Sequence, residues 1–293
     1  MFIIKTHYSL LLSLLLLAAC SQQKTGRTEA VSKAGLASNR QEMPQLRDLI
    51  DHLGLQGSVL IYDVEGNIYH SNDFGWADSR HLPASTFKIP NAMIMLESGI
   101  MASDTASIKW LGDERMFKSW EQDMTLKQAF HRSCLPCYQQ MTRQLGFKQM
   151  QQFTGKLIGY GELLYDSTTY DRFWVEGSSG ISQMEQIEFL QRLYQEKLPF
   201  SERTYQLTKR MIVAQSNAHY RLSAKTGWSI VGDQNNGWYV GFLEADNQLY
   251  YFATNLTPKE KFDMSRFSKI RKELTFSAFR YLRIAKKDWE EFQ

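Results

Sequence analysis

The sequence has little of what marks a metalloprotein, a nucleic-acid-binding protein or an α/β-hydrolase. It contains only three cysteines and six histidines, and the histidines show no spacing typical of metal ligands. The formal net charge is only +3 at pH 7, and no long run of lysine and arginine indicates a nucleic-acid surface. No G-x-S-x-G motif marks an α/β-hydrolase serine. We therefore expect no metal site and no nucleic-acid partner.

Long apolar runs are also absent, except at the N-terminus. Residues 10–17 are almost entirely apolar, follow a short start that contains Lys5, and lead into the motif L-A-A-C that ends at Cys20. The run is too short for a comfortable membrane span and is typical of an export signal. L-A-A-C resembles the bacterial lipobox, so we interpret 1–19 as a lipoprotein signal peptide and Cys20 as the lipidated residue. The alternative is an ordinary secretory signal. Ser21 resembles the sorting residue of outer-membrane lipoproteins, and we expect a periplasmic protein anchored there.

The segment that follows is polar and has almost no large apolar side chains. Such a segment cannot bury enough surface to offset the entropy of ordering, so we predict that residues 20–42 form a flexible tether. It contains S-x-x-K at 21–24 and K-T-G at 24–26, two motifs that return later in the chain. A tether cannot hold catalytic groups in a fixed geometry, and we exclude these first copies from the chemistry.

The remaining residues, 43–293, predict one α+β domain. Strand patterns occur at 58–72 and again from about 220 onward, with turn signals at 65–67 and 245–248. Helical patterns occur at 43–57, at 85–99, through much of 105–200 and at 264–284. We therefore predict a mainly antiparallel sheet flanked by helices, with a helical subregion at about 81–204 inserted in it.

The second copy of S-x-x-K, Ser85 to Lys88, begins one of the predicted helices. Side chains three residues apart on a helix project to the same face. A serine hydroxyl is a poor nucleophile until a base removes its proton, and a lysine serves as that base only when its pKa is lowered. The neighbours Phe87, Ile89 and Pro90 favour burial of Lys88. A helix cap followed by a surface lysine is the alternative.

The second K-T-G, Lys225 to Gly227, lies in a strand pattern. Lys225 and the Thr226 hydroxyl would suit an anionic carboxylate, and Gly227 would let a substrate approach an edge strand closely. A plain turn at a strand end is the alternative.

Together with other segments in order, these motifs resemble the penicillin-interacting serine acyltransferases, and within them the class D (OXA-type) serine β-lactamases. The resemblance covers roughly residues 45–285. It rests on PASTFKIPNAMIMLESG (83–99), on Ser133-Cys134-Leu135 in place of S-x-V, on Tyr160-Gly161-Glu162 in place of Y-G-N, and on DRFWVEG (171–177), AKTGW (224–228) and GWYVGF (237–242). Neither S-D-N nor the glutamate loop of class A enzymes is found.

The resemblance implies a reaction and a role for each matched residue. Ser85 would attack the lactam carbonyl and form an acyl-enzyme. Lys88 would react with carbon dioxide to give N6-carboxylysine, the general base for acylation and for the deacylating water. Trp174 would donate its indole N–H to this carbamate, and Ser133 would pass a proton to the leaving nitrogen. No cofactor besides carbon dioxide or bicarbonate is implied.

Substrate binding follows from the same resemblance. Lys225 and Thr226 would bind the substrate carboxylate with Arg266, although Arg271 is an alternative to Arg266. Gly227 would line this site, and the backbone N–H groups of Ser85 and Trp228 would form the oxyanion hole. The partner is then a β-lactam small molecule, and the protein is a monomer or a homodimer.

Two departures from the family pattern concern Leu135 and Glu162. Leu135 stands where valine is usual and is bulkier by one methylene, which would change access to the lysine. Glu162 replaces the asparagine of Y-G-N and puts the hydrogen bonding of that loop in question.

Cys134 and Cys137 lie next to Ser133 in a chain expected in an oxidising compartment, where a disulfide would stiffen the site. Buried cysteines are common, and an i, i+3 pair within a helix is poorly placed for bonding. We therefore predict two free thiols, with the disulfide as the alternative. A zinc site would need more ligands.

Two other functions compete with a β-lactamase. A penicillin-binding protein or DD-peptidase would release the antibiotic slowly, and a β-lactam sensor would be acylated without turnover. Sensors normally carry transmembrane helices and a signalling domain, for which we expect no room in this chain.

Overall fold

The structure, a computed structural model, describes residues 39–157 and 159–286. The predicted signal peptide, the lipidation site Cys20 and most of the predicted tether lie outside these residues. The chain divides into two units, Met1–Arg40 and Gln41–Gln293. The architecture described below is that of the second unit, together with Arg40, where strand β1 begins. Among the described helices, none is long and apolar enough to cross a bilayer.

A seven-stranded sheet has the strand order β1-β3-β2-β9-β8-β7-β6. Its strands are β1 (Arg40–Glu42), β2 (Leu55–Asp63), β3 (Ile68–Ser71), β6 (Val213–Ser216), β7 (Tyr220–Val231), β8 (Gln234–Ala245) and β9 (Gln248–Pro258). The neighbouring pairs β3–β2, β2–β9, β9–β8, β8–β7 and β7–β6 are all antiparallel. At the predicted turn between β8 and β9, Asp246 and Asn247 both take positive φ, as a two-residue hairpin loop requires. The predicted antiparallel sheet is confirmed.

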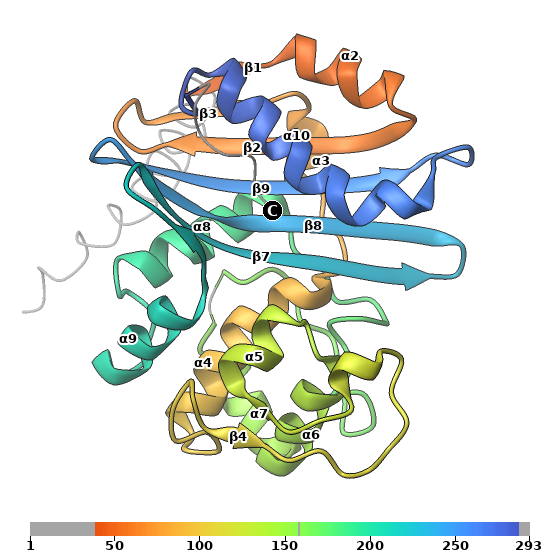
Figure 1. Cartoon of the computed structure of the whole chain (residues 1–293), viewed down its shortest axis with the longest axis vertical. Helices are drawn as coiled ribbons and strands as arrows, with labels where there is room; N and C mark the ends of the chain where they lie inside the picture. Colours follow the sequence, from red (N-terminus) through yellow and green to blue (C-terminus); the bar gives the residue numbers. More distant parts are fainter. Residues whose placement is uncertain (1–38, 158, 287–293) are drawn as a thin grey trace, which may run out of the picture. The chain divides into compact units, whose positions relative to one another are not determined.

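Helices lie on both sides of this sheet (Figure 1). The helices are α2 (Pro44–His52), α3 (Phe74–Asp78), α4 (Lys88–Glu97), α5 (Leu126–His131), α6 (Leu135–Leu145), α7 (Phe147–Thr154), α8 (Gln183–Tyr194), α9 (Glu202–Met211) and α10 (Phe267–Tyr281). Short 3₁₀ turns occur at η1 (Ala84–Phe87), η2 (Lys118–Trp120) and η3 (Met264–Arg266), and a small second sheet pairs β4 (Ser107–Ile108) with β5 (Met124–Thr125). Helices α4 to α9 fall between β3 and β6, so the predicted inserted helical region is confirmed.

Two apolar cores hold these layers together. One joins the sheet to α2 and α10 and includes Leu256, Leu274 and Phe279. The other joins the opposite face to the helical region and includes Phe87 and Trp238. Burial of side chains of this size stabilises the fold by about 1.5–3 kcal/mol for each. The second core surrounds the helix that begins after Ser85.

Two predicted boundaries are wrong. The predicted tether runs to residue 42, yet Arg40–Glu42 form the edge strand β1. Strands pair through backbone N–H and C=O groups, whatever their side chains are. A segment of polar composition can therefore form an edge strand, and the composition alone did not indicate it. The predicted helix over 43–57 ends at His52, because Gly54 takes φ +75° and Leu55 begins β2.

Candidate active site

The second S-x-x-K lies where η1 passes into α4. Ser85 is in η1 after Ala84, which takes φ +53°, and Lys88 is the first residue of α4. The Lys88 ammonium donates a hydrogen bond to the Ser85 hydroxyl at 2.8 Å. Lys88 is fully buried, and its Nζ atom lies 5.3 Å from the centre of the Tyr138 ring. The alternative of a surface lysine is therefore wrong.

Burial also sets the protonation of this lysine. Removing the charged form from water lowers the pKa of Lys88 from its usual value to about 7. A lysine with this pKa is neutral in a large fraction of molecules near neutral pH. A neutral amine can accept the proton of the adjacent Ser85 hydroxyl, and it can also react with carbon dioxide.

A second serine–lysine pair joins another part of the helical region to the sheet. Ser133 lies in the turn between α5 and α6 with φ +51°, and its hydroxyl accepts a hydrogen bond from the Lys225 ammonium on β7. Lys225 also donates to the Thr226 carbonyl at 2.8 Å. Burial lowers the pKa of Lys225 well below its usual value, and the positive charge of Lys88 lowers it further. The two pairs thus belong to one electrostatic site.

Gly227 explains how β7 comes close to η1, which carries the predicted nucleophile Ser85 and is called the nucleophile turn below. A Cβ atom on Gly227 would lie 3.2 Å from the Thr86 methyl and 3.3 Å from the Ala84 Cβ. Contacts this short are rare, so a larger residue would push β7 away from η1. Gly227 thus gives room to the turn that carries Ser85, and its predicted role in substrate binding stays a prediction.

Trp174 lies in the core beside the same turn. It is fully buried, and its ring stacks on Phe87 with the ring centres 5.4 Å apart. Within the described residues its indole N–H has no hydrogen-bond partner. A buried donor without an acceptor is destabilising by about 1–3 kcal/mol. Trp174 is thus a buried donor beside the turn that carries Ser85, with room in its hydrogen bonding for an acceptor.

On the opposite face of β7, Trp228 packs against α10. The residue is 38% exposed, and its ring lies 5.2 Å from the Phe267 ring, centre to centre. Ser85 is the second residue of η1, and the first N–H groups of a helix have no acceptor within it. The two residues predicted to form the oxyanion hole thus lie on the nucleophile turn and on the strand packed against it.

The structure separates the two arginines left open by the sequence. Arg271 is buried, and its guanidinium donates to the carbonyl groups of Phe267, Gly227, Trp238 and Ser268. The bonds to Gly227 and Trp238 fix α10 to β7 and β8, and every guanidinium nitrogen of Arg271 donates to a carbonyl group. Arg266 is exposed at the end of η3 and directly precedes Phe267, the residue that packs on Trp228. Arg266 is therefore the better candidate for a substrate carboxylate.

This difference gives a testable expectation. Arg266→Ala should raise the KM for a substrate with a carboxylate by about tenfold with little change in kcat, since one charge-assisted bond is lost. Arg271→Ala should instead lower the melting temperature, because the buried carbonyl groups of Phe267, Gly227 and Trp238 lose the Arg271 donor. Steady-state kinetics and thermal unfolding of both variants, with Arg266→Lys as a control that keeps the charge, check this. A normal KM in Arg266→Ala together with a raised KM in a folded Arg271→Ala would reverse the assignment.

The Y-G-E loop keeps its hydrogen bonds without asparagine. The backbone N–H and C=O of Glu162 pair with those of Gly180, at 2.7 and 2.8 Å. The Glu162 carboxylate instead forms a surface ion pair with Arg80 at 3.2 Å. The replacement by glutamate thus leaves the loop paired through its backbone. Leu135, the other departure, is the first residue of α6 and packs partly buried against the core.

The prediction of two free thiols is wrong. Cys134 and Cys137 form a disulfide with their Cα atoms 5.4 Å apart. The prediction assumed that both residues lie within a regular helix, but Cys134 is the N-cap of α6 and has ψ 98°. Its side chain can therefore turn toward Cys137. No pattern in the loop before α5 pointed to Arg115, whose guanidinium lies against both sulfurs.

Among residues 39–157 and 159–286, no group of three or more histidine, cysteine, aspartate or glutamate side chains is placed to hold a metal ion.

A nucleophile turn with a buried lysine, a second serine–lysine pair and a K-T-G strand beside them define a penicillin-interacting serine enzyme. The family model described as the penicillin binding protein transpeptidase domain matches residues 56–276. Beta-lactamase OXA-10 of Pseudomonas aeruginosa is 40% identical over 189 residues, which are 64% of this chain and 70% of that protein. Beta-lactamase OXA-19 of the same species is 34% identical over 78% of this chain and 86% of its own.

The similarity extends to solved structures. The class D β-lactamase of Sebaldella termitidis aligns with a TM-score of 0.78 and 33% identity, over 83% of this chain and 97% of that one. The chain belongs to the class D, or OXA-type, serine β-lactamases.

Proposed function

We propose that the protein hydrolyses β-lactam antibiotics through an acyl-enzyme on Ser85, and that N-carboxylated Lys88 activates the deacylating water. The observation that carries the proposal is the fully buried Lys88 ammonium 2.8 Å from the Ser85 hydroxyl, with its pKa lowered to about 7. Membership of the class D serine β-lactamases supports the reaction class, a serine hydrolase that opens a cyclic amide.

Acylation follows from the two serine–lysine pairs. Ser85 attacks the lactam carbonyl as its proton passes toward Lys88, and the N–H groups of Ser85 and Trp228 stabilise the oxyanion. The C–N bond of the lactam then breaks. Ser133, whose hydroxyl is held by Lys225, delivers the proton to the leaving nitrogen.

Substrate orientation comes from the strand. Lys225 and the Thr226 hydroxyl present a cation and a donor on β7, and Arg266 would complete a cationic site for the carboxylate. A fixed carboxylate places the lactam carbonyl against Ser85, which converts an encounter into a reaction within one complex.

Carboxylation of Lys88 is supported by the surroundings of the side chain. A carbamate on Lys88 would supply a carboxylate as general base for acylation and for the deacylating water. Trp174 would then donate its buried indole N–H to that carboxylate. This bond would remove the free-energy penalty of a buried donor without an acceptor. Lys88 is fully buried, with its Nζ atom 5.3 Å from the centre of the Tyr138 ring, and this burial favours its neutral form.

The proposal includes the location of the protein. Lipidation of Cys20 would anchor the domain in the periplasm, at the outer membrane, through buried acyl methylenes. These residues lie outside the part of the chain that the structure describes, and the support is the sequence pattern alone.

Counting turnovers tests the proposal. The purified protein is mixed with a chromogenic β-lactam, with and without bicarbonate, and product molecules per enzyme are followed over time. We expect many turnovers, with a lower rate after bicarbonate is removed. A single burst that leaves a stable adduct on Ser85 would instead indicate a sensor or a slow penicillin-binding protein.

A further inference from the structure

The disulfide lies directly beside a proposed proton-transfer residue. Cys134 follows Ser133 in the chain, and its sulfur is bonded to that of Cys137 in the first turn of α6. Both cysteines are buried, with at most 1% of their surface exposed. The bond therefore fixes the residue that follows Ser133 to the start of a helix.

Ser133 needs such support because of its backbone conformation. Its φ of +51° lies in the left-handed region, which residues other than glycine adopt rarely. On its N-terminal side, the Arg132 carbonyl accepts a hydrogen bond of 2.9 Å from the Trp120 indole. On its C-terminal side, the Cys134 N–H donates to the Ala129 carbonyl at 2.9 Å. Contacts on both sides thus hold the Ser133 hydroxyl toward Lys225.

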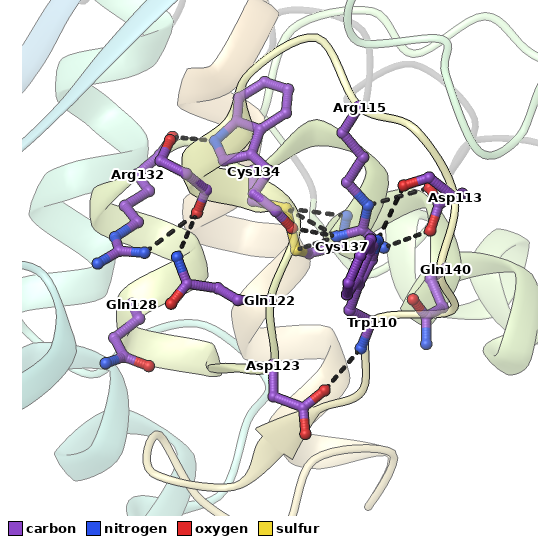
Figure 2. Close-up of a disulfide and its surroundings, with 12 residues drawn as sticks. Trp110, Asp113, Arg115, Gln122, Asp123, Gln128, Arg132, Cys134, Cys137 and Gln140 are labelled. Carbon is purple, nitrogen blue, oxygen red and sulfur yellow. Dashed lines mark hydrogen bonds and ion pairs between the residues drawn. A yellow bond between two sulfur atoms is a disulfide. The ribbon is translucent and has the colours of Figure 1, made fainter.

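Arg115 connects the two sides (Figure 2). Its Nη1 lies 3.5 Å from the Cys137 sulfur and 3.8 Å from the Cys134 sulfur, and it donates to the Trp120 carbonyl at 2.9 Å. Asp113 binds the same guanidinium through two bonds of 3.0 and 3.1 Å. The Arg115 side chain is buried, so this charge is paired and fixed.

We propose that the Cys134–Cys137 disulfide and Arg115 act together as the positioning unit of Ser133, so that reduction of the disulfide slows acylation while the protein stays folded. The inference rests on the proposed function, in which Ser133 delivers a proton to the lactam nitrogen. The step is a two-electron reduction: a dithiol reagent becomes a cyclic disulfide, and Cys134 and Cys137 each gain a hydrogen as thiols.

Two features make the effect local. A disulfide between residues three apart closes a very short loop, and the constraint that it places on the unfolded chain is small compared with that of a long loop. The surrounding core of α4, α5 and α6 contains many buried apolar side chains besides the two cysteines, and we expect it to stay packed without the bond. The loss of the bond therefore releases mainly the Ser133 turn. The burial of both sulfurs means that a reagent must act during local opening, so we expect slow reduction.

The experiment compares the full-length protein before and after reduction with dithiothreitol, followed by anaerobic removal of the reagent. Peptide-resolved mass spectrometry after alkylation in denaturant reports the state of Cys134 and Cys137. Stopped-flow measurements then give the rates of acylation and of deacylation separately. We expect acylation to fall about 10- to 100-fold, as a displacement of about 1 Å can cause, with the deacylation rate and the melting temperature nearly unchanged. Re-oxidation should restore the rate.

Three variants keep the inference open to refutation. Cys134→Ala/Cys137→Ala should acylate as slowly as the reduced protein and should not respond to dithiothreitol. Arg115→Lys keeps a positive charge and should lose less than Arg115→Ala. Normal acylation in the reduced protein and in the double variant would overturn the inference and leave the disulfide a stabilising bond only. Failure of the oxidised protein to hydrolyse any β-lactam would instead overturn the proposed function, so the two failures are distinct.

Discussion

Ser85→Ala should lower the hydrolysis of a chromogenic β-lactam by about 10³-fold or more, because the acyl-enzyme cannot form without a nucleophile. The hydroxyl that accepts the Lys88 hydrogen bond is lost, and no other described hydroxyl has that contact. The rate of product formation and the mass of the protein after incubation with the substrate check this result. We expect no added mass on the variant.

A serine at the other end of the same helix provides the control. Ser98 caps the C-terminus of α4 and donates to the Met95 carbonyl, away from the site. Ser98→Ala should keep the kcat of the unchanged protein and its melting temperature within a few degrees. Retention of activity in Ser85→Ala would show that the first committed step is assigned to the wrong residue.

The second large effect concerns Lys88. Lys88→Met keeps the volume of the side chain but removes the base, and we expect kcat to fall by about 10³-fold, within the range seen when one member of a catalytic set is removed. The same change should raise the melting temperature near pH 7, because the buried amine no longer has to lose its proton on folding. Activity and stability should thus change in opposite directions.

The pH dependence of kcat tests the role of Lys88 as a base. The pKa of Lys88 is about 7 in the folded protein and above 10 when exposed. Below about pH 7 the amine is protonated, and it can neither accept the Ser85 proton nor react with carbon dioxide. We therefore expect kcat to fall as the pH is lowered through about 7, and added bicarbonate to help more above that pH than below it.

Lys88→Met should lack this pH dependence, which separates the titration of Lys88 from that of other groups. A profile of the unchanged protein that is flat between pH 6 and 8, in saturating bicarbonate, would contradict a role for the lysine as base. Unfolding at pH 7 and at pH 9.5 gives a second check. The stability advantage of Lys88→Met should shrink at the higher pH, where the unfolded lysine gains fewer protons.

Much of the site could be predicted because the motifs are short and continuous. Ser85 and Lys88 lie three residues apart, and a helix start puts them on one face whatever the rest of the fold. Lys225 and Thr226 are neighbours in a strand pattern that the structure confirms as β7. The hairpin turns at 65–67 and 245–248 were equally local, because turn residues report their own backbone conformation.

The disulfide and the different roles of Arg266 and Arg271 could not be predicted from short motifs. Whether Cys134 and Cys137 bond depends on where α6 begins, and Cys134 falls just before the first helical residue. Arg266 and Arg271 are both basic residues near the start of one helix. Only the packing of α10 against β7 shows that the Arg271 donors are used by backbone carbonyls.

The sequence by itself determined the family and the α+β fold class, and it pointed to Ser85 and Lys88 as the proposed nucleophile and base, because each depends on the order of short motifs or on hydrophobic periodicity. The tertiary structure decided how deeply Lys88 is buried, which serine Lys225 holds, how closely Gly227 approaches the turn that carries Ser85, and what supports Ser133. These features depend on contacts between residues far apart in the chain. Such contacts form only when η1, the α5–α6 turn and β7 pack together, and a single sequence carries no direct record of them.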